Sequence, residues 1–392
     1  MANKHIGLLS DSFPPTIDGV AQTVKNYATC LQQNHGDVTV VTPAYKNVRD
    51  DYPFDVFRYQ SVPLDPRIGY RAGNVFNPEA IRALRKKNFD LLHIHVPFAS
   101  SILAEKINPK REIPTVLTYH TKFEVDFERR MRSSAMRRVA LEFVLRNVNA
   151  VDEVWAVTQK CGDALRAIGY KGEYRVMENG TDFVFGKAEG AKVDQLRADY
   201  RIPEDAFVFL FVGRMMWYKN IRLMLDMLRQ VKEKGLCFRC FMIGGGLDVQ
   251  DMAAYAKEIG LSEEMIFTGP IYDREYLRVF YSLSDLFLFP STYDTSGIVV
   301  KEAAACQCPS LMIRDSCASE GAVHNVSGFL AEESADDCAR VLLEACGSRE
   351  RLTAVGEEAG RTLYLSWEDA VKRASARYDE ILRGWNGPKN TK

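Results

Sequence analysis

The 392-residue chain lacks several patterns that would assign it to a membrane or disulfide-stapled class. No apolar run approaches the ~20 residues that span a bilayer. The short apolar run near the N-terminus is broken by Asp11 and Pro14-Pro15, so it makes a poor signal peptide. The nine cysteines show no paired Cys-x-x-Cys motifs, and Cys306 and Cys308 are the closest two. We interpret them as core thiols in a reducing compartment.

Two other signatures are missing. Neither the first apolar run nor Ile243-Gly244-Gly245-Gly246 forms a Gly-x-Gly-x-x-Gly fingerprint, which argues against a nicotinamide enzyme. The chain has no zinc spacing and no RNP-like aromatic pattern, so we predict no nucleic-acid partner. His93 and His95 alternate along one run without Cys or carboxylate at ligand spacing, and we interpret them as strand residues rather than a zinc site.

The net charge of −1 hides an asymmetry. Residues 1–175 carry 25 Lys and Arg against 19 Asp and Glu, whereas the remainder carries 26 against 33. A basic half beside an acidic half indicates that the first half meets something anionic. An anionic membrane surface is the stronger candidate.

Apolar runs alternate with helical segments in both halves, which predicts parallel sheets covered on both faces. We therefore expect an α/β protein of two doubly wound, Rossmann-like domains. The first covers residues 1–176 and the second covers residues 177–365, and a last helix follows at 366–384. Ligands of such sheets bind at the carboxyl ends of the strands, so two facing sheets predict a shared cleft. The expected strands are 5–9, 38–42, 91–95, 115–118 and 153–157, then 207–212, 238–243, 265–268, 286–289 and 310–313; the helices are 20–33, 78–87, 220–235, 249–260 and 273–282.

Charged residues follow the strands of the second half. Asp294 and Glu302 lie eight residues apart around Thr295-Ser296-Gly297 at a predicted helix start, a pattern that suits sugar hydroxyls. Arg214 and Lys219 follow the strand 207–212. Arg can bind two phosphate oxygens at once and Lys adds a point charge, so the pair suits a diphosphate. A fold that joins the two groups would bind a nucleotide sugar.

Three weaker signals remain open. Gly19 before a helix lets the backbone approach a phosphate. The alternative is a glycine that only a tight loop requires. The glycines 244–246 admit a close ligand or tight packing. His120 follows a strand and could bond a sugar hydroxyl, or be a satisfied polar group.

Residues 128–148 are rich in arginine, with apolar Met131, Met136, Val139, Phe143 and Leu145 interleaved. The pattern resembles a basic amphipathic helix on anionic headgroups. A surface helix that packs its apolar side on its own domain is the alternative. The arginines are Arg129, Arg130, Arg132, Arg137, Arg138 and Arg146.

In combination and order, these motifs resemble the family 4 retaining glycosyltransferases of GT-B fold, over nearly the whole chain. The carriers are Asp18-Gly19-Val20, Glu178-Asn-Gly-Thr-Asp182, the Gly-Arg-x4-Lys-Asn run at 213–220, Phe267-Thr-Gly-Pro270, Phe289 to Gly297 leading into Lys301-Glu302-Ala-Ala, and a closing Ser366-Trp367 helix. In this fold the last helix crosses back onto the N-terminal domain.

The resemblance implies a role for each matching residue. Arg214 and Lys219 would hold the donor diphosphate near the Gly19 and Gly245 backbone, and Glu302 would bind the ribose hydroxyls. Asp294 and the amides of Thr295, Ser296 and Gly297 would hold the hexose, with backbone around Ile271 at the base. His120, Asp294, Arg214 and Lys219 would form the catalytic set. No metal-binding Asp-x-Asp adjoins them, so the expectation is metal-independent transfer with retention and no cofactor beyond the nucleotide-sugar substrate.

Asp294 departs from the family's usual Glu, which shortens the side chain's reach by about one bond. The segments Tyr119 to Glu124 and Asp294-Thr-Ser-Gly resemble the diacylglycerol glucosyltransferase branch. That branch implies a peripheral enzyme on the cytoplasmic face of the cell membrane that moves glucose from UDP-glucose to a lipid such as diacylglycerol. Tyr70, Arg71 and Phe123 would lie near the acceptor channel, and Arg129, Arg130, Arg137 and Arg138 would face the membrane.

Other functions fit the same architecture. The acceptor could be a soluble glycan, inositol or malate. A sugar-nucleotide epimerase would need no acceptor, and a non-catalytic nucleotide-sugar sensor would fit the altered Asp294.

Overall fold

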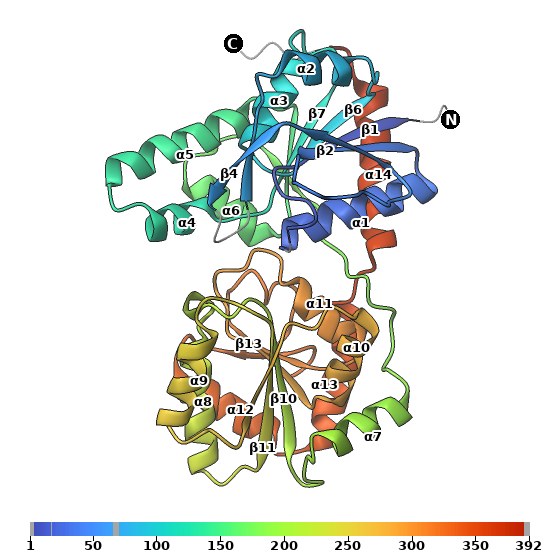
Figure 1. The fold of residues 1–392 in the computed structure, drawn as a ribbon. Coiled ribbons are helices and arrows are strands. Elements are labelled where there is room, and N and C mark those ends of the chain that lie inside the picture. Colours follow the sequence, from blue (N-terminus) through green and yellow to red (C-terminus); the bar gives the residue numbers. More distant parts are fainter. Residues whose placement is uncertain (1–3, 17, 66–69, 388–392) are drawn as a thin grey trace. The chain divides into compact units, whose positions relative to one another are not determined.

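The computed structural model describes residues 4–16, 18–65 and 70–387 (Figure 1). The chain divides into two compact units. The N-terminal unit runs to Asn179 and takes up the chain again from Trp367, and the C-terminal unit covers Gly180–Ser366. The sequence placed this boundary between residues 176 and 177.

The N-terminal unit is built on a seven-stranded parallel sheet of order β3-β2-β1-β6-β7-β8-β9. An antiparallel hairpin, β4–β5, stands apart from it. The strands of the N-terminal unit are β1 His5–Leu9, β2 Asp37–Pro43, β3 Asp55–Tyr59, β4 Ser61–Asp65, β5 Tyr70–Gly73, β6 Leu91–Ile94, β7 Thr115–Tyr119, β8 Glu153–Ala156 and β9 Tyr174–Val176. Its helices are α1 Gly19–Asn34, α2 Pro78–Arg85, α3 Ala99–Ile107, α4 Phe123–Arg130, α5 Ser134–Asn149, α6 Gln159–Ala167 and α14 Trp367–Gly384.

The C-terminal unit has a six-stranded parallel sheet of order β12-β11-β10-β13-β14-β15. Its strands are β10 Phe207–Val212, β11 Phe238–Ile243, β12 Met265–Gly269, β13 Leu286–Phe289, β14 Ser310–Ile313 and β15 Phe329–Ala331. Its helices are α7 Gly190–Asp199, the 3₁₀ turn η1 Trp217–Lys219, α8 Ile221–Glu233, α9 Val249–Glu258, α10 Arg274–Leu283, α11 Ile298–Ala305, α12 Ala335–Ala345 and α13 Arg349–Thr362.

Strand β10 shows why this sheet needs helices on both faces. Phe209 and Phe211 pack into a cluster with α8, α9 and α12, whereas Val208 and Leu210 pack into another with α10 and α11. Successive side chains of a strand point to opposite faces, so an unbroken apolar run is buried only when both faces are covered. The two doubly wound sheets expected from the sequence are therefore confirmed.

The last helix packs on the N-terminal unit, as the GT-B expectation requires. In α14, Trp367 meets the ring of Tyr27 edge-on, and Tyr378 stacks on Trp155 with centroids 5.3 Å apart. Lys4 forms an ion pair with Asp379 at 2.7 Å. These contacts join α14 to α1, to β8 and to the residue before β1.

The arginine-rich segment is not one helix. Helix α4 ends at Arg130, and α5 begins at Ser134, where the Ser133 hydroxyl caps it by accepting from the Met136 amide. The expectation of a single amphipathic helix was wrong because this N-cap starts a new helix. The later turns of α5 bury Val144 and Val148 in the unit, whereas Met136 and Val139 remain exposed.

The cysteines carry no disulfide among the described residues. Cys237 and Cys240 form a single Cys-x-x-Cys spacing, but Cys237 is exposed and Cys240 lies buried on β11. Within the described part of the chain, no helix combines the length and apolarity needed to cross a membrane.

Candidate functional site

Lys219 and Asp294 form an ion pair at the carboxyl ends of β10 and β13. The Lys219 ammonium lies 2.8 and 2.9 Å from the two carboxylate oxygens of Asp294. Lys219 is buried at the end of η1. Residues 75 positions apart in the sequence thus meet at one end of the sheet, where α/β proteins bind their ligands.

The electrostatics of this pair favour its charged form. Burial raises the pKa of Asp294, but the Lys219 ammonium outweighs burial and, with Ser291 and Arg214, holds the pKa below its usual range. Arg214 is exposed and lies close enough to act on Asp294. The site therefore presents two cations and one ionised carboxylate at neutral pH.

The glycines after β11 serve packing. A Cβ on Gly244 would lie 1.9 Å from the Gly213 carbonyl oxygen, and one on Gly246 would lie 2.1 Å from that of Met215. Only Gly245 has space, with Pro270 at 4.0 Å as its sole close neighbour. The loops after β10 and β11 are thus held together by backbone contact, and Gly245 remains the open position there.

The turn before α11 carries the predicted hexose-binding residues. Gly297 caps α11 in the left-handed conformation, with φ at 56°, and a Cβ there would lie 2.9 Å from that of Ala318. The Ser296 hydroxyl is buried and has no hydrogen-bond partner among the described residues. Thr295 is partly buried beside it. A helix N-terminus offers unpaired N–H groups, so this turn can bind electron-rich oxygens.

Glu302 has both carboxylate oxygens occupied. Arg274 donates to Oε1 at 2.6 Å, and the Tyr281 hydroxyl donates to Oε2 at 2.9 Å. Arg274 also binds Asp182 and lies over the Phe183 ring. Burial raises the pKa of Glu302, and Arg274 offsets part of that rise.

Arg274 was missed by sequence reasoning. It is the first residue of α10, after the Asp273 N-cap, and it belongs to none of the motifs. Ile271, in the same connection, packs against the cluster that covers one face of the sheet. Only the fold brings Arg274 to Glu302.

In the N-terminal unit, His120 belongs to a buried imidazole network. Its Nε2 lies 3.0 Å from Nδ1 of His95, and the two rings stack. His93 bonds Tyr378 through Nδ1 and Thr118 through Nε2. Burial lowers the pKa of His120 to about 4, with Asp18 opposing the shift, and holds the pKa of His93 and of His95 well below the usual range. All three rings are neutral at pH 7.

His93 lies on β6 as predicted, whereas His95 follows Ile94, the last residue of that strand, and partners His120. The rings of His93 and His95 nevertheless lie close together, with centroids 4.1 Å apart. Among the described residues, no group of three or more His, Cys, Asp or Glu is placed to hold a metal ion.

Gly19 is the first residue of α1, and a Cβ there would meet nothing within 4 Å. Asp18 caps the helix by accepting from the Ala21 amide, and its second oxygen accepts from Ser12 and from the Tyr70 hydroxyl at 2.7 Å. The structure thus brings Tyr70 to the Gly19 turn. It also places Asp18 near enough to influence His120.

The other predicted acceptor residues are spread over the N-terminal unit. Arg71 is held within the hairpin, where it donates to the Ser61 hydroxyl and carbonyl. Phe123 is buried between Tyr119 and Phe98. Arg129, Arg130 and Arg138 are exposed, and Arg137 is partly buried.

Comparison with known proteins agrees with this geometry. Residues 17–184 match the family Glycosyltransferase Family 4, and residues 192–362 match the family Glycosyl transferases group 1. Alpha-monoglucosyldiacylglycerol synthase of Streptococcus pneumoniae is 25% identical over 313 residues, which are 78% of this chain and 70% of that protein. The protein of the same name from Acholeplasma laidlawii is 24% identical over 323 residues, or 79% and 80%.

The fold has solved counterparts. HepE of Anabaena, solved in complex with UDP-glucose, superposes with a TM-score of 0.76, covering 97% of this chain and 100% of its own at 18% identity. That likeness establishes the GT-B architecture of two Rossmann-like domains.

Proposed function

The chain is a glycosyltransferase of family 4 with the GT-B fold, and from this premise we propose that it transfers a hexose from a nucleotide sugar to a lipid acceptor. The favoured donor is UDP-glucose and the favoured acceptor is diacylglycerol at the cytoplasmic surface of the cell membrane. Both choices rest on the relatives, which include two alpha-monoglucosyldiacylglycerol synthases and a protein solved with UDP-glucose.

The observation that carries the proposal is the buried Lys219–Asp294 pair beside Arg214. When the glycosidic bond breaks, negative charge grows on the diphosphate and the sugar becomes oxocarbenium-like. Lys219 and Arg214 would bind that charge more tightly in the transition state than in the ground state. Asp294, freed in part from Lys219, would accept a hydrogen bond from the hexose.

The remaining roles follow the same logic. Glu302 would bind the ribose hydroxyls, which requires it to share or exchange its contact with Arg274. The α11 amides would face the sugar. His120 is proposed to contact the transferred sugar as a neutral imidazole, with retention of configuration and no metal.

Two substitutions test the donor site. Lys219→Ala and Glu302→Ala should each abolish turnover of UDP-glucose, because each removes a contact to the donor. A thermal-shift panel of UDP-, GDP- and ADP-sugars identifies the donor, since a ligand that binds only the folded state raises its apparent stability. Wild-type rates in either variant would refute this site.

A second measurement tests the acceptor. An enzyme of lipid surfaces should co-sediment with anionic vesicles at low salt and be released as salt screens the charges. Transfer to a soluble glycan, with no vesicle binding at any salt concentration, would favour the soluble-acceptor alternative. Binding of the donor with no hydrolysis and no transfer would favour the sensor.

A further inference from the structure

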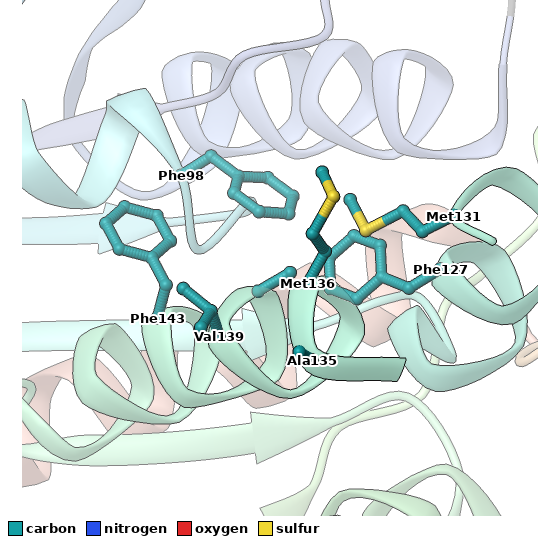
Figure 2. Close-up of a pocket in the computed structure, with 8 residues that line it drawn as sticks. Phe98, Phe127, Met131, Ala135, Met136, Val139 and Phe143 are labelled. Atoms are coloured by element: carbon teal, nitrogen blue, oxygen red, sulfur yellow. The ribbon is translucent and has the colours of Figure 1, made fainter. Parts of the chain in front are cut away.

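An apolar groove opens in the N-terminal unit between the end of α4, the start of α5 and the residue before α3 (Figure 2). Its volume is about 550 Å³. Such a volume falls within the range of roughly 300–1,000 Å³ that is usual for small-molecule sites. Every side chain that lines it is apolar: Phe98, Phe127, Met131, Ala135, Met136, Val139, Ala140 and Phe143. We call this the α4–α5 groove.

The groove is open to solvent on one side. Met136 is 62% exposed and Val139 is 65% exposed. Figure 2 shows the methionine and phenylalanine side chains facing one another across a common space. An exposed apolar hollow of this kind indicates a ligand or an interaction surface.

Its floor is a packed aromatic cluster. The ring of Phe98 meets Phe123 edge-on at 5.0 Å and stacks with Phe143 at 6.3 Å. Phe123 in turn contacts Tyr119, the residue before His120. The groove therefore has a rigid inner wall, and the flexible side chains of Met131 and Met136 at its mouth can adapt to an irregular apolar ligand.

Its rim is basic. Arg129 and Arg130 end α4, Arg132 lies in the break between the helices, and Arg138 follows on α5; all four are exposed. Glu128 and Glu142 are the only acids in residues 128–148. An apolar hollow in a segment this rich in exposed arginine complements an amphiphile with a negative head and a hydrocarbon tail. It disfavours a second copy of the chain, because two basic rims would repel.

We propose that the α4–α5 groove binds one fatty acyl chain of an anionic membrane lipid while the rim arginines bind its phosphate. The inference deepens the membrane part of the proposed function and rests on it for its biological setting. It differs from adsorption of a charged surface to headgroups, because it requires one chain to leave the bilayer and enter the protein. The groove is thus a lipid site with a stoichiometry of one.

The test uses the full chain and a monomeric probe, cis-parinaric acid, whose fluorescence rises in apolar surroundings. Wild type should bind it saturably with one site per chain. Ala140→Phe, which fills the groove, should weaken binding at least tenfold. Ala167→Phe adds the same ring at an exposed position of α6, outside the groove, and should bind as wild type does.

Vesicles separate the groove from the arginines. On phosphatidylglycerol vesicles, Ala140→Phe should keep the salt-sensitive part of binding and lose the part that survives high salt. Arg132→Ser with Arg138→Ser should lose the salt-sensitive part and still bind parinaric acid. Phosphatidylcholine vesicles, which carry no net charge, should bind wild type and both variants only weakly.

Several outcomes would overturn the proposal. They are the absence of saturable parinaric acid binding, equal binding by Ala140→Phe, or a groove-dependent dimer in sedimentation, which would mean that a second copy occupies the groove. Should Ala140→Phe fail to fold, Met136→Glu and Val139→Glu change exposed positions and should abolish probe binding. Probe binding needs no sugar donor, so a lack of transferase activity would refute the proposed function and leave this result standing.

Discussion

The two units hold their buried polar groups in opposite ways. The C-terminal unit pairs full charges, Lys219 with Asp294 and Arg274 with Glu302. The N-terminal unit buries three imidazoles that bond one another or neutral hydroxyls. At these positions the C-terminal unit uses paired charges, and the N-terminal unit uses neutral rings.

The difference matches the charges that each unit is expected to meet. A buried cation without a partner is costly, so an internal carboxylate keeps Lys219 in place until a diphosphate arrives. A neutral imidazole keeps one donor and one acceptor and needs no counter-ion. Such a ring can contact a sugar while positive charge develops there without repelling it.

The largest expected effect comes from breaking the charge pair. Lys219→Met should lower kcat/KM by about 10²–10³, because a cation aimed at developing charge is lost. It should also lower the free energy of unfolding by about 3–5 kcal/mol, because Asp294 is left without its cation. Transfer assays and chemical denaturation measure the two effects.

The matched control is Lys219→Met with Asp294→Asn. Removing both charges should restore most of the stability, since no uncompensated carboxylate remains. It should not restore transfer. Recovery of activity in the double variant would mean that Lys219 serves only to neutralise Asp294.

The next effect tests whether the N-terminal unit avoids buried charge. Burial raises the pKa of Asp11, which follows β1 and accepts from the Ser100 amide, to about 7. Because the pKa of Asp11 is higher in the folded state than in the unfolded state, the stability that protonated Asp11 contributes is fully present below about pH 4. It is lost as pH rises through 7. Asp11→Asn should therefore be more stable than wild type above pH 7, by about 4 kcal/mol.

Denaturation of both proteins at pH 4 to 8 checks this. The buried histidines also make stability depend on pH, in the opposite direction: because their pKa values are lowered, they cost stability as pH falls below about 6.5. This contribution is the same in both proteins, so it cancels in the difference between variant and wild type. A difference that does not change with pH would show that Asp11 is not a buried titrating group.

The same contrast explains what the sequence could predict. Strands β10, β11, β13 and β14 match their predicted bounds because each is a mostly apolar run, as buried parallel strands are. The edge strands β3, β9 and β15 and the β4–β5 hairpin were not predicted, because short and half-exposed strands lack such runs. The sequence also located the glycines and charged residues of the motifs, because each motif is defined by short spacing along the chain.

Partnerships were harder to predict than positions. The sequence located Lys219, Asp294 and Glu302, but their pairing with one another or with Arg274 depends on how the strands are ordered. His95 and His120 lie 25 residues apart, each directly after one of two neighbouring strands, and only the pairing of β6 with β7 brings their rings together. Tertiary contacts of this kind leave no local pattern.

An intermediate effect probes Glu302. Glu302→Gln keeps the shape and removes the charge, so Arg274 keeps a neutral acceptor in place of a charged one. UDP binding should weaken by about tenfold to a hundredfold, in line with about 1.5–3 kcal/mol for a hydrogen bond to a charged group. Titration calorimetry with UDP and with uracil separates the ribose and phosphate contacts from base binding, which should not change.

The smallest effect concerns His95 as a positioning residue. Nε2 of His95 is buried and has no hydrogen-bond partner among the described residues, so the tautomer with the proton on Nδ1 leaves no donor unused. Nδ1 then donates to Nε2 of His120, which fixes the His120 proton on its own Nδ1. His95→Phe should remove that restraint and lower kcat by about tenfold, the equivalent of one hydrogen bond, with little change in KM for the donor.

A purely structural role for His95 predicts a different result. ¹⁵N NMR of the imidazoles should report His120 protonated on Nδ1 in wild type and a mixture of tautomers in His95→Phe. His95→Gln, whose amide can donate at a similar reach, should restore both the single tautomer and most of kcat. If kcat falls while the His120 tautomer stays unchanged, the loss arises from packing, and the neutral network of the N-terminal unit does not orient His120 for its proposed role.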